Sequence, residues 1–87
     1  MSEKLIVLRN KIDQIDDQIL SLLKKRISCM GKIGEIKKMD KLSIRDDKRE
    51  KEKMKVIEQK GEKLGISLGL VTQVWTILFK QSEEIEK

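Results

Sequence analysis

The sequence predicts an all-α fold of three helices, one long and two shorter, in a single domain over residues 1–87. Apolar residues recur at alternating three- and four-residue intervals along most of the chain, which is the spacing of an amphipathic helix. The 87 residues include no proline, and Lys, Glu, Leu and Ile are all acceptable in helix interiors. Two short breaks in the pattern, at about 39–45 and 65–67, separate the three helices.

The first helix is predicted to run from about Glu3 to about Lys38. Its apolar positions begin with Leu5, Leu8, Ile12, Ile15, Ile19 and Leu22. A helix of this length is a rod of ~54 Å, whereas a compact domain of this size has a radius of gyration of only ~12 Å. Two shorter helices cannot cover such a rod, so we expect a second copy of the chain to pack along it in an intertwined helical homodimer.

The second and third helices have recognisable starts. Asp47, with Glu50 three residues later, is the expected capping box of the second helix, and Asp46 is the rival N-cap. This helix is predicted to end near Lys60. Its expected inward-facing residues are Met54, Ile57 and Leu64. Ser67 is the expected N-cap of the third helix.

Composition restricts the chemistry and the location. The formal net charge of +5 favours an anionic partner: nucleic acid, an acidic membrane surface or a small polyanionic metabolite. One cysteine, Cys29, cannot form an internal disulfide, and no apolar run approaches the ~20 residues of a membrane span, so we expect a cytoplasmic protein. The absence of histidine removes Ser–His–Asp and Cys–His catalysis and the usual zinc ligand sets. An enzyme with this composition would depend on charge and positioning.

Arg26 occupies a position in the first helix where the apolar pattern calls for a hydrophobic residue, so it must meet an anion there. A structural ion pair with Glu50 is the simplest interpretation of this residue taken alone. Lys37 follows 11 residues later, which places it on the same helix face within about 20°. Arg9 lies about 100° away around the helix and points elsewhere. An ordinary surface arginine is the simplest interpretation of Arg9, but an antiparallel dimer could bring it into the partner's pocket.

Two further clusters of residues share helix faces. One contains Asp46, Arg49 and Glu50, spaced i, i+3, i+4, and it is also typical of a charged N-terminal helix turn. The other contains Phe79, Ser82, Glu83 and Glu86 on the third helix. Phe79 and Trp75 are the only aromatic residues, and we expect both in the core.

These positions together resemble the all-helical chorismate mutases. The matching elements are Leu8-Arg9-x-Lys11-Ile12-x-x-Ile15-Asp16, Leu23-x-x-Arg26, Gly34-x-x-Lys37, Ile44-Arg45-Asp46-x-x-Arg49-Glu50, Gly61 and Ser82. Each element is weak alone, but their order and spacing over nearly the whole chain are specific. The resemblance implies a stand-alone enzyme that rearranges chorismate, a small dianion, to prephenate without a metal or a cofactor, and with no nucleic-acid or membrane partner.

The resemblance also assigns roles to individual residues. It implies that Arg26 and Arg49 bind the substrate carboxylates and that Arg9 is donated across the dimer interface. Lys37 would donate to the ether oxygen of the breaking bond. The remaining expected substrate contacts are Asp46 and Glu50 at the ring hydroxyl and Ser82 at the ring carboxylate.

One position departs from the family pattern. Where the family commonly has a glutamine, or sometimes a glutamate, as second donor to the ether oxygen, this chain has Glu86, and an ionised carboxylate can only accept hydrogen bonds. We therefore expect Glu86 to act as a catalytic donor only when protonated. Two alternatives stay open: an isochorismate-pyruvate lyase of the same fold, and a non-catalytic helical module for dimerisation or nucleic-acid binding.

Overall fold

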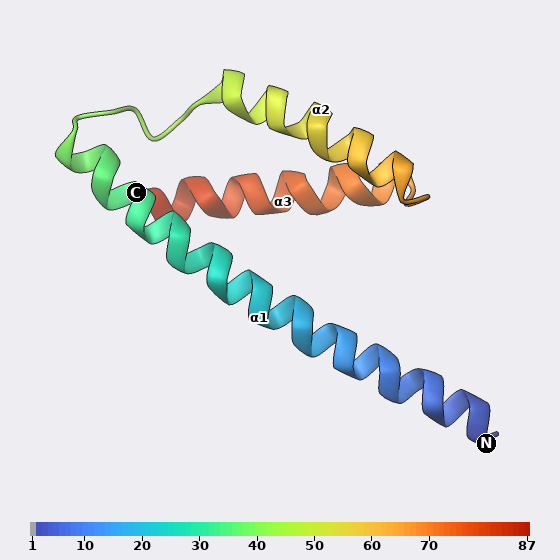
Figure 1. The fold of residues 1–87 in the computed structure, drawn as a ribbon. Coiled ribbons are helices and arrows are strands. Elements are labelled where there is room, and N and C mark those ends of the chain that lie inside the picture. Colours follow the sequence, from blue (N-terminus) through green and yellow to red (C-terminus); the bar gives the residue numbers. More distant parts are fainter. Residues whose placement is uncertain (1) are drawn as a thin grey trace.

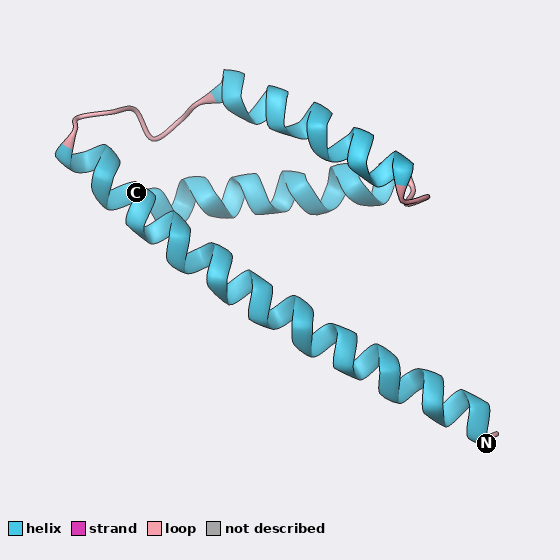
Figure 2. Ribbon diagram, in the orientation of Figure 1, coloured by secondary structure: helices cyan, strands magenta, loops and turns pink. Residues whose placement is uncertain are grey.

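The computed structural model describes residues 2–87 and has the predicted order of one long and two shorter helices (Figures 1 and 2). Helix α1 spans Glu3–Met39, α2 spans Asp47–Lys63 and α3 spans Leu68–Glu86. No strand occurs within residues 2–87, so the all-α prediction is confirmed. The predicted end of the second helix, near Lys60, falls three residues short of the end of α2.

Each helix begins at a polar N-cap, as expected for residues that accept from the free N–H groups of the first turn. The Ser67 side chain accepts from the Leu70 N–H at 3.2 Å, as predicted. The capping box at Asp47 is wrong, because Asp47 is already the first residue of α2. Its neighbour Asp46 has the non-helical backbone of an N-cap, and its Oδ1 accepts from the Arg49 N–H at 3.0 Å.

Helix α2 ends in a Schellman turn after Lys63. Gly65 adopts a left-handed conformation, with φ of 74°, and the Ile66 N–H donates to the Gly61 carbonyl at 2.9 Å. Gly61 therefore lies inside α2, where it is buried. The prediction that Leu64 faces inward is wrong: Leu64 is the C-cap residue and its exposure is 75% in this chain, because the helix turns away there.

Helix α1 ends in the same way, but with a lysine in the position that glycine favours. Lys41 has φ of 54°, and the Leu42 N–H donates to the Lys37 carbonyl at 2.7 Å. A left-handed backbone disfavours residues with a Cβ, so this turn carries conformational strain. The loop of residues 40–46 then leads to α2 (Figure 1).

The three helices make an open, elongated arrangement. Helix α3 packs against both the C-terminal half of α1 and α2, while the N-terminal half of α1 extends away from the other two helices (Figure 1). The radius of gyration is 16.7 Å and the longest dimension is 58 Å. A compact domain of this size would have a radius of gyration of only ~12 Å.

The projecting half of α1 leaves its apolar face uncovered. Within residues 2–87, Val71 is the only hydrophobic side chain in the buried class, at 4% exposure. Along α1, by contrast, Leu8 and Ile12 are 59% and 55% exposed. Such an uncovered apolar face is what the predicted homodimer would bury; the homodimer itself stays a prediction. No helix within residues 2–87 combines the length and the apolar character that a membrane span needs.

Candidate active site

A cavity of about 370 Å³ lies where the C-terminal half of α1, the loop after it, the start of α2 and the end of α3 meet. Its lining residues are Arg26, Met30, Ile33, Lys37, Ile44, Asp46, Arg49, Glu50, Lys53, Phe79, Ser82 and Glu86. Seven of the eight residues predicted to form the site therefore surround one cavity within a single chain. The eighth, Arg9, does not line it.

Arg26 is held in the cavity wall by α3. Its Nη1 donates to Ser82 Oγ at 2.7 Å and to the Leu78 carbonyl at 3.3 Å. Ser82 is buried, and its hydroxyl in turn donates to the same Leu78 carbonyl at 2.8 Å. The expected ion pair between Arg26 and Glu50 does not form. Within residues 2–87, no carboxylate forms an ion pair with the Arg26 guanidinium. Arg26 is thus oriented by neutral groups and keeps its full charge for an anion.

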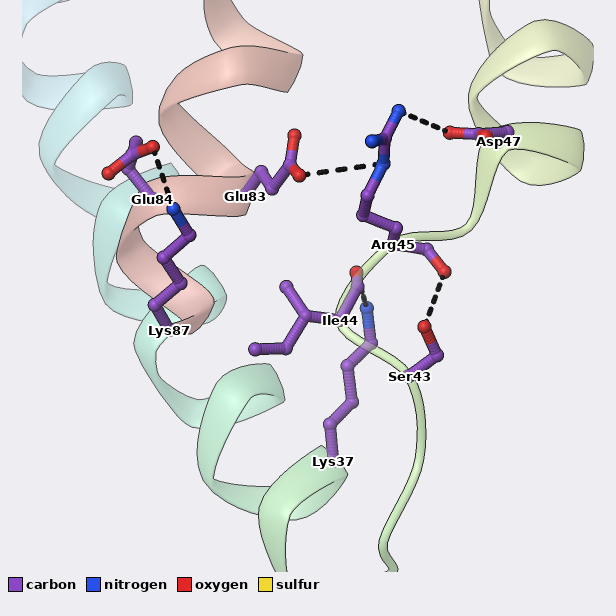
Figure 3. A network of polar contacts seen from close by, with 8 residues as sticks. All are labelled: Lys37, Ser43, Ile44, Arg45, Asp47, Glu83, Glu84 and Lys87. Carbon is purple, nitrogen blue, oxygen red and sulfur yellow. Dashed lines mark hydrogen bonds and ion pairs between the residues drawn. The ribbon is translucent and has the colours of Figure 1, made fainter.

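Lys37 is held from two sides. Its Nζ forms an ion pair with Glu86 Oε1 at 2.6 Å, and the two side chains are only 20% and 8% exposed. The same Nζ donates to the Ile44 carbonyl at 3.0 Å, a contact that Figure 3 shows. An ammonium group has three N–H donors, so these two contacts leave one donor for a ligand.

The loop before α2 is tied down near the cavity by polar contacts (Figure 3). Arg45 forms ion pairs with Asp47 at 3.4 Å and with Glu83 of α3 at 3.5 Å. The Ser43 hydroxyl donates to the Arg45 carbonyl at 3.0 Å. Exposed pairs of this kind contribute only ~0–1 kcal/mol each, so they orient the loop more than they stabilise the fold.

The first two turns of α2 supply the opposite wall of the cavity. Asp46, Arg49 and Glu50 all line it, as their shared helix face predicts. Lys53 joins them, although the sequence analysis did not assign it to the site. Its spacing of four residues from Arg49 was the signal that could have identified it.

The sequence analysis also did not identify the apolar part of the cavity lining as a binding surface. Met30, Ile33 and Phe79 line the cavity, and Phe79 was expected only in the core. Its spacing of three residues from Ser82, on the cluster already noted, places it on the cavity side of α3. An apolar wall beside charged groups is typical of sites for small organic ligands.

Arg9 lies far from this cavity in its own chain. It is on the projecting part of α1, 17 residues before Arg26. At 1.5 Å per residue, the two positions are ~26 Å apart along the helix. One chain therefore cannot bring both arginines to one small ligand.

The charges of the cavity suit a small organic anion with more than one carboxylate. Arg26, Lys37, Arg49 and Lys53 supply four cationic groups, and the three acidic side chains in the lining are concentrated at the α2 start and at Glu86. Guanidinium groups match carboxylates in bidentate geometry, and the fixed ammonium group supplies a directed hydrogen-bond donor.

Comparison with known proteins identifies a family that matches most of the chain. The model of a family described as chorismate mutase type II matches residues 8–87. A chorismate mutase from Methanocaldococcus jannaschii is 31% identical over 87 residues, covering 100% of this chain and 88% of that protein. A bifunctional chorismate mutase/prephenate dehydratase from Buchnera aphidicola is 28% identical over 86 residues, which are 99% of this chain.

Some similar proteins are much longer than this chain. A protein named T-protein from Enterobacter agglomerans is 30% identical over 82 residues, or 94% of this chain. The present chain spans only 22% of the length of the Buchnera protein and of the T-protein. Among solved structures, a conserved hypothetical protein from Pyrococcus furiosus superimposes with a TM-score of 0.78 at 34% identity, covering 100% of both chains.

Proposed function

The chain belongs to the chorismate mutase type II family, and we propose that it catalyses the Claisen rearrangement of chorismate to prephenate in aromatic amino-acid biosynthesis. The observation that carries this proposal is the pairing of Arg26 and Lys37 in one cavity, each fixed by neighbouring groups before a ligand arrives. Chorismate carries two carboxylates and an ether oxygen, and the cavity offers cations for all three.

The reaction is unimolecular: one C–O bond breaks as one C–C bond forms, and no nucleophile or proton donor is consumed. Catalysis then has two sources. The cavity holds the enolpyruvyl side chain folded over the ring, which lowers the entropic part of the barrier. Preorganised donors stabilise the negative charge that develops on the ether oxygen, and one such donor contributes about 10²–10³-fold to kcat.

The proposed roles follow the contacts that each side chain makes. Arg26 and Arg49 bind the carboxylates, with the Ser82 hydroxyl orienting Arg26 at 2.7 Å and lying beside the ring carboxylate. Lys37 uses its remaining N–H for the ether oxygen, because the other two donate to Ile44 and Glu86.

The acidic residues have separate roles in this proposal. Asp46 and Glu50, on the start of α2, accept from the ring hydroxyl. Glu86 holds Lys37 in place while ionised and donates to the ether oxygen when protonated.

The proposed functional unit is a homodimer in the cytoplasm. Covering the apolar face of α1 with a second copy would bring Arg9 of one chain toward the cavity of the other. The free and exposed Cys29 is compatible with a reducing compartment.

The test is an assay of the purified chain with chorismate, following loss of substrate and formation of prephenate. The Arg26→Ala and Lys37→Ala variants should keep a folded, helical dimer and lose turnover by about 10²-fold or more each. Isochorismate is the control substrate. Formation of salicylate and pyruvate from isochorismate, with no prephenate from chorismate, would identify a lyase and refute the mutase assignment.

A further inference from the structure

Gly34 is the one residue of α1 in the buried class. It is buried by the last turn of α3, because the backbone of Glu86 lies directly against it. A Cβ placed on Gly34 would be 2.8 Å from Glu86 Cα and 2.9 Å from the Glu86 carbonyl oxygen. These are backbone atoms, which cannot rotate away as the tip of a side chain can. The two helices thus approach at this point to a distance that only glycine permits.

This close approach has a chemical consequence one turn further along α1. Gly34 and Lys37 are spaced i, i+3, so they lie on the same side of the helix. With the Glu86 backbone on Gly34, the Glu86 carboxylate meets the Lys37 ammonium at 2.6 Å. An ordinary carbon–carbon contact is 3.5–4.0 Å, so a methyl group at position 34 would push the end of α3 back by roughly 1 Å.

We propose that Gly34 is a positioning residue for the reaction, which acts by letting the last turn of α3 place Glu86 against Lys37. The inference rests on the proposed function, since it assigns Gly34 a role only through two groups that act on the ether oxygen. A displacement of about 1 Å in a catalytic group can lower turnover by up to 10²-fold. Gly34 is therefore required for rate, not only for packing.

The experiment uses the full chain and measures kcat, KM and melting temperature for Gly34→Ala. We expect kcat to fall by about ten- to a hundred-fold, with KM changed less than about threefold, because Arg26 and Arg49 stay where they are. Gly61→Ala is the matched control. Its added Cβ would also be too close to a neighbour, at 2.7 Å from Val71 Cγ2, but the contact joins α2 to α3 away from the cavity.

The control separates packing from catalysis. Gly61→Ala should lower the melting temperature and leave kcat within about twofold of the wild-type value. Gly31→Ala, on α1 with nothing within 4 Å of the added Cβ, should change neither quantity unfavourably. If Gly34→Ala and Gly61→Ala change kcat to the same extent, Gly34 acts only through packing and the proposal is wrong.

A double-variant cycle tests whether the effect passes through Glu86. In a Glu86→Ala background, adding Gly34→Ala should lower kcat by less than about twofold, because the positioned group is already gone. A full additional loss would overturn the proposal. If Gly34→Ala does not fold, Glu86→Asp provides the test. This substitution moves the carboxylate back by one methylene and leaves the backbone contact with Gly34 unchanged. A wild-type kcat for Glu86→Asp would overturn the proposal.

Different results would refute the proposed function and the proposed role of Gly34. Absence of prephenate formation by the wild-type chain would refute the proposed function, and this inference with it. Normal wild-type turnover together with an unaffected Gly34→Ala variant would refute this inference alone.

Discussion

Mixing two inactive variants should restore activity if each site takes Arg9 from one chain and the other catalytic groups from its partner. Arg9→Ala removes the group donated across the interface, and Lys37→Ala removes the ether-oxygen donor of the chain's own cavity. Arg9 is ~26 Å from Arg26 along α1, so neither variant can repair its own site. A mixed dimer, however, contains one site that receives both wild-type groups.

The expected recovery follows from counting sites. Random exchange of equal amounts gives about half mixed dimers, and each mixed dimer has one intact site out of two. The mixture should therefore regain about a quarter of the wild-type activity per chain. The second site of the mixed dimer lacks both groups and contributes nothing.

The assay is the initial rate of chorismate consumption after the two variants are unfolded together and refolded to allow exchange. A mixture of Lys37→Ala with Arg26→Ala is the matched control, because both residues line the same cavity of one chain. That mixture leaves every site defective and should recover no activity. Recovery in the control, or none in the Arg9→Ala mixture, would refute the assignment of Arg9 to the partner's site.

Three further outcomes are expected. Glu86→Gln should keep or raise kcat/KM, because an amide beside Lys37 can donate a hydrogen bond to the ether oxygen; a loss of turnover would show that Glu86 acts only as an acceptor for Lys37. Ser82→Ala removes the acceptor 2.7 Å from Arg26 and should lower kcat/KM about tenfold, mainly through KM, while the variant keeps the helical content of the wild-type chain. Lys41→Gly relieves the left-handed backbone at φ of 54° and should raise the free energy of unfolding by up to about 1 kcal/mol; a lower melting temperature would contradict this reasoning.

Local periodicity was sufficient to predict the helices, but it left their ends ambiguous. The long apolar pattern predicted α1 to within one residue at its C-terminus. Asp46 and Asp47 are chemically identical N-cap candidates, and only the backbone conformation distinguishes them. The left-handed turn at Lys41 could not be predicted, because lysine gives no sequence signal for that conformation.

For the site, too, the sequence identified individual residues but not the contacts between distant parts of the chain. A charged residue in an apolar seam identified Arg26, because a cation in that position needs a partner. The sequence could not reveal that this partner is the neutral pair of Ser82 and the Leu78 carbonyl, more than 50 residues away. Nor could it reveal the contact between Gly34 and Glu86, which depends on how α3 packs across α1.

The exposed half of α1 links the stability of the fold to the completeness of the site. Its apolar face, which includes Leu8 and Ile12, is uncovered in the single chain, and Arg9 lies on the same stretch of helix. One chain buries little hydrophobic surface, since Val71 is the only hydrophobic residue in the buried class within residues 2–87. A second copy that covers this face would supply the missing burial. The same contact would bring Arg9 to the neighbouring cavity, so a chain that has not paired would lack both a full core and a full site.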